Sequence, residues 1–150
     1  MAIFGNDKTD ENINKANGVT LERAHKVVMA ARQKAEDIGV QMNVAVVDAG
    51  GNLTAFIRMD NAWLGSIDIA QGKAFSARAF DMPTKDLGAE SQMGKSLFGI
   101  NASNHGKIII FAGGIPLKDG ERVVGAIGVS GGSVEQDQQV AEAGVAAFDK

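Results

Sequence analysis

The sequence predicts one α+β domain built in three layers, with helices covering an antiparallel sheet. Apolar residues recur at helical spacing near both ends of the chain, and short apolar runs bounded by turn residues lie between them. A length of 150 residues and a hydrophobic content of 45% suit a single domain with a sizeable core. We expect about five strands and four helices.

The first helix is predicted over residues 21–38. Thr20 is a suitable N-cap, and Gly39 is a suitable C-terminal stop. Six apolar residues share one face of this helix: Leu21, Ala24, Val28, Ala31, Ala35 and Ile38. The polar residues 1–18 are interpreted as a flexible arm, so the domain is expected to span residues 19–150.

A strand hairpin is predicted next, in residues 42–60. Its turn, at residues 48–52, contains two adjacent glycines. A helix is expected in residues 63–80, and Pro83 separates it from a weaker helix that starts near Thr84.

The last third of the chain is predicted to contain three strands and a helix. The segments KIIIFAGG (107–114) and IPLK (115–118) are typical of two short strands, and an Asp119-Gly120 turn leads into a long last strand. A helix over about 134–148 closes the chain.

Small side chains occupy one predicted face of the last strand. Strict alternation places Val124, Ala126, Gly128 and Ser130 on that face, and Val123, Gly125, Ile127 and Val129 on the other. Small residues inside a strand mark a place where another group comes close to the backbone. That group is either a tightly packed helix or a flat ligand.

The corner Ser130-Gly131-Gly132-Ser133 precedes the last helix. Free amides at a helix start can bind a carboxylate or a phosphate. However, Ser133 and Gln136 fit a capping box, and Glu135 and Asp137 already complement the helix dipole. The sequence therefore favours a plain structural corner, with an anion site as the alternative.

Four charged or titratable side chains lie near the glycine corners at 50–51, 113–114 and 131–132. Arg58 can bind a carboxylate, Lys73 can act as a point charge or an amine base, and His105 can move protons or bind a metal. Asp60 follows the second strand and could simply pair with Arg58 or Lys73. His25 lies at the flank of the first helix, where an ordinary surface role is the simpler interpretation.

Composition excludes several classes of function. The net charge of −3 and the absence of a basic stripe argue against a nucleic-acid partner. The chain has no cysteine, so disulfides and thiolate metal sites are excluded, and no spacing typical of a metal site is present. No apolar segment suits a membrane span or a signal peptide, so we expect a cytoplasmic protein with no membrane partner.

Four segments together resemble the GlcG/HbpS family, which includes the C-terminal domain of PduO-type proteins. They are VAVVDAGGNLTAFIRMDNA, KAFSA, GKIIIFAGGIPL and VVGAIGVSGGSVEQDQQVAEAG. The resemblance covers the chain from Thr20 onward. It implies a profilin-like three-layer α/β/α sandwich with a five-stranded antiparallel sheet, and homo-oligomers from dimers to octamers.

The resemblance also implies a set of ligand-binding residues and a cofactor. The positions that match family motifs are Arg58, Asp60, Lys73, Gly113, Gly114, Pro116, Gly131, Gly132, Glu135 and Asp137. Several members of the family bind haem, for which His25 in the first helix is the candidate iron ligand.

The leading hypothesis is therefore a small-molecule-binding protein whose ligand is haem or a carboxylated metabolite. The alternative is a metal-independent isomerase or lyase acting on a hydroxy or oxo acid, with Lys73 or His105 as the base and Arg58 as the carboxylate clamp. A third hypothesis is an accessory subunit with a purely structural role.

Overall fold

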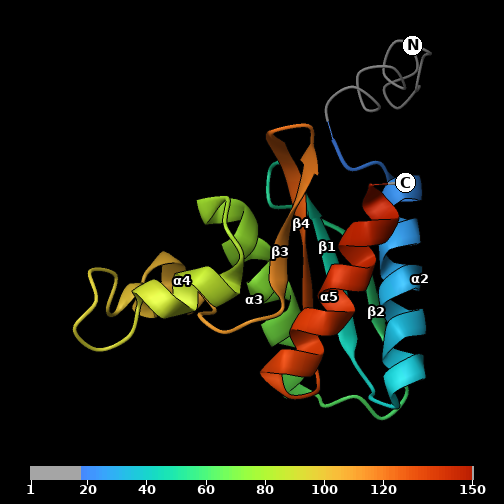
Figure 1. Ribbon diagram of the computed structural model, residues 1–150, viewed down its shortest axis with the longest axis horizontal. Coiled ribbons are helices and arrows are strands. Elements are labelled where there is room, and N and C mark those ends of the chain that lie inside the picture. Colours follow the sequence, from blue (N-terminus) through green and yellow to red (C-terminus); the bar gives the residue numbers. More distant parts are fainter. Residues whose placement is uncertain (1–17, 150) are drawn as a thin grey trace, which may run out of the picture.

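The computed structural model describes residues 18–149 and contains four strands and four α-helices within that range (Figure 1). The strands are β1 (Asn43–Asp48), β2 (Leu53–Arg58), β3 (Gly114–Asp119) and β4 (Arg122–Ser130). The α-helices are α2 (Leu21–Ile38), α3 (Gly65–Phe80), α4 (Thr84–Glu90) and α5 (Val134–Phe148). Two short 3-10 helices, η1 (Ile100–Ala102) and η2 (Asn104–Gly106), lie between α4 and β3.

The four strands form one antiparallel sheet in the order β2-β1-β4-β3. Asn43 at the start of β1 faces Arg58 on one neighbouring strand and Ser130 on the other. The ends of β2 and β4 therefore lie at the same end of the sheet, two strands apart.

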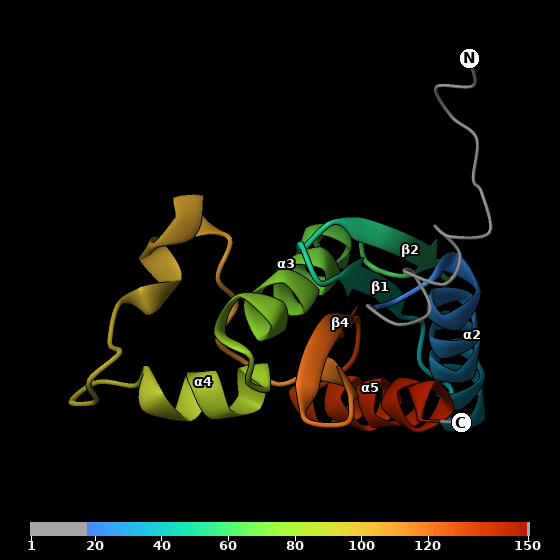
Figure 2. The same ribbon diagram turned by 90° about the horizontal axis from the view of Figure 1, so that it is seen from above.

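Helices cover both faces of this sheet (Figure 2). On one face, α2 and α5 pack against each other and against larger aliphatic residues of the strands, including Val44, Val46 and Ile127. On the other face, α3 packs through alanines against Ala45 and Ala126. The fold is therefore an α+β domain in three layers.

Three helix boundaries confirm the expectations from local sequence. The Thr20 side chain accepts a hydrogen bond from the Arg23 amide at 3.1 Å, and Gly39 ends α2 in the left-handed conformation. Ser133 and Gln136 form the expected capping box at the start of α5. These helix ends satisfy their free backbone groups locally, which is why the sequence alone could place them.

The expected five-stranded sheet is wrong, because the sheet formed by residues 18–149 has four strands. Residues 107–113, which we expected to be part of a strand, form no ladder, and a single strand follows from Gly114 to Asp119. The Ile109 amide donates instead to Ser76 Oγ of α3 at 2.9 Å. Since this backbone group bonds to a helix side chain, the apolar run packs along α3 rather than joining the sheet. Whether the fold is profilin-like stays a prediction.

Strict alternation along β4 is also wrong at one residue. Val123 faces Lys118 and Gly125 faces Leu117, so Val124 is an extra residue in the ladder. Such a bulge turns a side chain to the opposite face. Val124 consequently joins the core below α2 and α5, rather than the small-residue face that contacts α3.

The surroundings of Gly128 show which group packs against the small-residue face of β4. A Cβ atom added there would clash with the Ala70 carbonyl oxygen and the Ala74 amide of α3. The group that approaches the strand is therefore a tightly packed helix, which decides between the two alternatives posed by the sequence.

The chain between α3 and β3 extends away from the three layers. Figures 1 and 2 both show α4 and the segment that follows it lying to one side of the sheet. Within residues 18–149, no helix is long and apolar enough to cross a membrane. The predicted arm, residues 1–18, lies outside the described residues except for Gly18.

Candidate functional site

Lys73 in α3 and Asp137 in the first turn of α5 form a buried ion pair. The Lys73 Nζ donates to Asp137 Oδ2 at 2.6 Å and to the Val129 carbonyl oxygen at 2.8 Å. The two side chains are 0% and 3% exposed. The Gly132 amide donates to the other carboxylate oxygen of Asp137 at 2.9 Å. One lysine therefore links α3, β4 and α5.

Two of the three predicted glycine corners, at 113–114 and 131–132, lie beside this ion pair. A Cβ atom added at Gly113 would lie 2.6 Å from the Val129 carbonyl oxygen and 2.8 Å from Lys73 Nζ. One added at Gly114 would meet the Lys73 carbonyl group. Gly131 packs in the same way against the Gln41 carbonyl oxygen. The glycines at these corners let backbone pack against a buried charge pair, and they leave no room there for a ligand.

Burial shifts the pKa of both partners. Desolvation lowers the pKa of Lys73 below its ordinary value, and the attraction of Asp137 opposes that shift. Desolvation likewise raises the pKa of Asp137, and its interactions with Lys73 oppose the rise. In both cases burial is the larger cause, so this pair is electrostatically costly to enclose.

The geometry of Lys73 favours a structural role. Its ammonium group faces a carboxylate and a carbonyl oxygen, and its third neighbour is the Phe111 ring, whose centroid lies 5.0 Å away. No side-chain surface of Lys73 reaches solvent. A role for Lys73 as a catalytic base or a ligand contact stays a prediction that this burial does not favour.

Arg58 and Asp60 lie apart from Lys73, at the end of β2. Both are exposed, and they line a hollow of about 500 Å³ together with Arg32 and Glu36 of α2. Arg58 Nη2 donates to the Ala62 carbonyl oxygen at 2.8 Å. Arg58 and Lys73 were expected to act together on one ligand, but they line no common hollow among the described residues.

His25 is exposed on α2, where exposed apolar residues flank it. Leu21 and Met29 lie one turn before and one turn after it, with 70% and 37% of their surface exposed. Within residues 18–149, the imidazole forms no hydrogen bond or ion pair.

His105 and Glu135 are exposed at two other places. His105 lies in η2 with a left-handed backbone (φ 58°). Glu135 lies in the first turn of α5 and lines a groove of about 600 Å³ with Lys85 and Gln138. His25, His105 and Glu135 thus belong to three separate surfaces.

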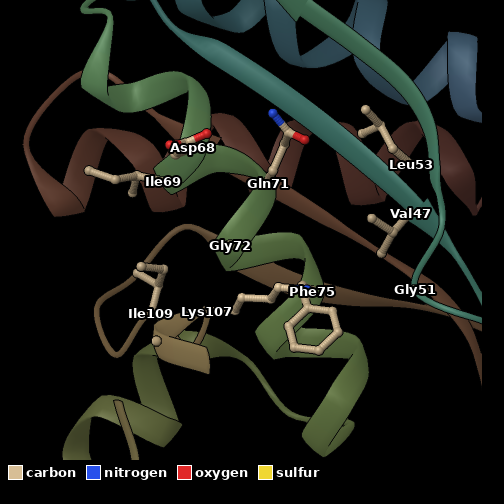
Figure 3. A pocket seen from close by; sticks show the side chains of 11 residues that line it. Val47, Gly51, Leu53, Asp68, Ile69, Gln71, Gly72, Phe75, Lys107 and Ile109 are labelled. Carbon is tan, nitrogen blue, oxygen red and sulfur yellow. The ribbon is translucent and has the colours of Figure 1, made fainter. Parts of the chain in front are cut away.

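A further pocket lies between α3, the β1–β2 turn and the segment that leads out of η2 (Figure 3). Its volume is about 400 Å³. Apolar side chains form most of its wall: Val47, Leu53, Ile69, Phe75 and Ile109. The polar side chains that line it are Asp68, Gln71 and Lys107.

The sequence reasoning missed these pocket residues, except for the glycine corner at 50–51. Asp68, Gln71 and Phe75 recur at three and four residues along α3, which places them on one side of a helix. This spacing could have indicated from the sequence that the three side chains line one surface. Lys107 could not be placed, because its segment was expected to be a strand.

No group of three or more histidine, aspartate or glutamate side chains capable of holding a metal ion occurs in the part of the chain that the structure describes.

The fold defines the class of protein: a small α+β domain with helices on both faces of an antiparallel sheet. Residues 19–146 match the family described as "Haem degrading protein HbpS-like". The chain belongs to this HbpS-like family, which confirms the resemblance to the GlcG/HbpS family.

Three relatives illustrate the similarity. An uncharacterised 15.0 kDa protein from the dhaT-dhaS intergenic region of Citrobacter freundii is 40% identical over 132 residues, which are 88% of this chain and 93% of that protein. The crystal structure of Klebsiella pneumoniae protein ORFY has a TM-score of 0.85 and 42% identity, covering 87% of this chain and 90% of that one. The crystal structure of a PduOC:heme complex has a TM-score of 0.84 and 35% identity, covering 87% and 94% of the two chains.

Proposed function

We propose that this protein binds haem and that His25 is the axial ligand of the haem iron. The observation that carries the proposal is the similarity to the PduOC:heme complex, at a TM-score of 0.84 over 87% of this chain. The family description, which names haem, supports the same ligand.

The surface around His25 fits a haem group. An imidazole nitrogen is a common axial ligand of haem iron, and this imidazole is exposed and unpaired among residues 18–149. Leu21 and Met29 supply apolar contact for the porphyrin on either side, and Lys26 supplies a cation for a propionate. Haem would supply the iron centre, and the residues of α2 would bind and orient it.

His105 is the alternative iron ligand. It is also exposed, but its neighbours in η2 are Asn104 and Gly106, which offer no apolar surface. The contrast between the two histidines favours His25.

We further propose that the protein self-associates, so that a second copy covers the exposed haem face. Leu21, Met93 and Phe98 are each well over half exposed. Leu21 lies on α2 beside His25, whereas Met93 and Phe98 lie on the segment after α4, on the other side of the sheet (Figure 1). Large apolar side chains exposed at either place favour association with another protein surface. A homo-oligomer from a dimer to an octamer is the expected state.

A carboxylated metabolite is the second candidate ligand. The hollow beside Arg58 is lined by two arginines, Arg32 and Arg58, and by two carboxylates, Glu36 and Asp60. Arg32 is paired with Glu36 at 2.9 Å, so Arg58 is the guanidinium group that would bind a ligand's carboxylate. No observation favours the isomerase, the lyase or the accessory-subunit hypothesis over ligand binding.

Titration of the purified protein with haemin tests the proposed function. We expect a saturable shift of the Soret band that is lost in His25→Ala and retained in a His105 variant. Absence of a saturable shift would contradict the proposal.

A further inference from the structure

We propose that the pocket beside Phe75 binds a small organic anion with a flat apolar body, whose carboxylate faces Lys107. None of the residues that line this pocket belongs to α2, which carries His25. The inference therefore concerns a second site and does not depend on haem binding.

The pocket has the size and lining of a small-molecule site. A volume of about 400 Å³ falls within the range of roughly 300–1,000 Å³ for ligand pockets. The Phe75 ring lies among aliphatic side chains that come from β1, β2 and the segment after η2. A planar apolar body can pack against such a ring, since two aromatic rings attract each other in an offset-stacked or an edge-to-face arrangement.

Hydrogen bonds and close packing hold the pocket in shape before any ligand arrives. Ser76 Oγ accepts from the Ile109 amide at 2.9 Å and donates to the Gly72 carbonyl oxygen at 2.7 Å. A Cβ atom added at Gly72 would lie 2.7 Å from Ile109 Cγ1, and one at Gly51 would lie 3.6 Å from the Phe75 ring. The three walls are therefore fixed to one another, which lowers the entropic cost of binding.

Lys107 provides the charge that selects an anion. Its Nζ lies 5.7 Å from the centroid of the Phe75 ring, and Figure 3 shows its side chain running toward that ring. Among the ion pairs formed within residues 18–149, none involves Lys107. Besides its contact with the Phe75 ring, the ammonium group has no ion-pair partner among these residues, so it can donate hydrogen bonds to the carboxylate of a ligand that lies against Phe75.

The opposite end of the pocket sets the direction of the ligand. Asp68 and Gln71 lie together at the end away from Phe75 (Figure 3). The Asp68 carboxylate repels a second anion, whereas Gln71 can donate or accept a hydrogen bond. The ligand's carboxylate is therefore directed to Lys107, and a neutral polar group is accepted at the other end.

Benzoate is a suitable probe, because it combines a flat ring with one carboxylate. The test is a titration of the full-length, haem-free protein with benzoate, followed by amide NMR. The pocket contains Gly51, Gly72 and Gly106, whose amide signals fall in a distinct spectral region. We expect saturable shifts of these three signals, and weaker binding of benzyl alcohol, which lacks the charge.

Two lysine variants make the test specific. We expect Lys107→Met to weaken benzoate binding roughly three- to tenfold, as for one exposed charge-assisted contact. Lys118→Met, on β3 and outside this pocket, is the matched control and should bind as the parent does. Shifts that do not saturate, equal binding of benzyl alcohol, or full affinity in Lys107→Met would each overturn the proposal.

The haem proposal and this one can fail separately. Benzoate binding is measured without haem, so a protein that shows no Soret shift can still show the glycine shifts. Conversely, an absent benzoate response leaves the haemin titration unaffected.

Discussion

Lys73 Nζ and Asp137 Oδ2 are 2.6 Å apart, although 64 positions separate the two residues in the sequence. The pair joins the helix on one face of the sheet to a helix on the other, at the end of β4. Because both groups are buried, each charge depends on the other for its compensation.

Removing one member of this pair should therefore destabilise the protein strongly. We expect Lys73→Met to lower the free energy of unfolding by about 3–5 kcal/mol, because Asp137 keeps a buried charge without a partner. Urea denaturation followed by circular dichroism measures the change.

The double variant Lys73→Met/Asp137→Asn is the matched control. The side-chain amide that replaces the carboxylate would still accept from the Gly132 amide but carry no charge. We expect the double variant to recover at least about 2 kcal/mol relative to Lys73→Met alone. Additive losses from the two substitutions would show that the ion pair is not the source of the effect.

Gly128 should tolerate no side chain. An added methyl group would clash with the backbone of α3 at Ala70, and backbone cannot move aside as a side-chain tip can. We expect Gly128→Ala to cost at least about 2 kcal/mol in thermal or urea unfolding.

Gly65→Ala is the matched control for that substitution. Gly65 begins α3, and nothing lies within 4 Å of an added Cβ atom. Here alanine should change the stability by less than about 1 kcal/mol, in the stabilising direction. Equal losses in the two variants would refute the close approach of α3 to β4.

The Arg23–Asp119 ion pair should make stability depend on pH in the acid range. The hydrogen bond from Arg23 holds the pKa of Asp119 below the ordinary value of 3.8; burial opposes this shift, and the charges of Arg23 and Arg122 add to it. The unfolded chain thus binds more protons between these two pKa values, so the pair's contribution is complete above pH 3.8 and disappears as the pH falls through the folded-state pKa.

The acid unfolding of Asp119→Asn tests this dependence. Because the pair is partly exposed, we expect a loss of only about 0.5–1 kcal/mol at pH 6, which vanishes toward pH 2. The urea midpoint across this range gives the difference, and Glu121→Gln in the same turn is the control. A loss that stays constant with pH would count against the linkage.

The segment between α4 and β3 should contribute to self-association. Met93 and Phe98 are 87% and 66% exposed on a part of the chain that extends away from the sheet (Figures 1 and 2). We expect light scattering to give a multiple of the chain mass, and Met93→Ser/Phe98→Ser to reduce it. Ser96→Ala should leave the mass unchanged, and a parent protein that is monomeric would contradict the proposal.

Elements defined by local chemistry could be predicted from the sequence. Thr20 and Gly39 bound α2, and Ser133 caps α5, because these residues satisfy nearby backbone groups. Elements that depend on distant partners could not be predicted in this way. The run at 107–113 has strand-like composition, yet Ser76 of α3 takes the hydrogen bond that a strand would have given to a neighbour.

The same distinction between local features and distant contacts applies to the candidate site. The sequence singled out Lys73 and the glycine corners near it, but not the contact with Asp137 that buries the lysine. Arg58 was grouped with Lys73 because both are cations near predicted turns, whereas the strand order places Arg58 on an edge strand, in a separate hollow. Which strands pair in a sheet depends on the whole fold, so the strand order cannot be predicted from local sequence patterns.

The central claim is that His25, which is exposed on α2, binds haem iron. The haemin titration tests this claim most directly. The parent protein should show a saturable Soret shift. His25→Ala should lose this shift and stay folded, because residue 25 is an exposed position of α2 and alanine has a high helix propensity. His105→Asn is the control, because asparagine tolerates the left-handed backbone at that position, and it should bind haem as the parent does. An unchanged Soret shift in His25→Ala, or its loss in His105→Asn, would contradict the assignment.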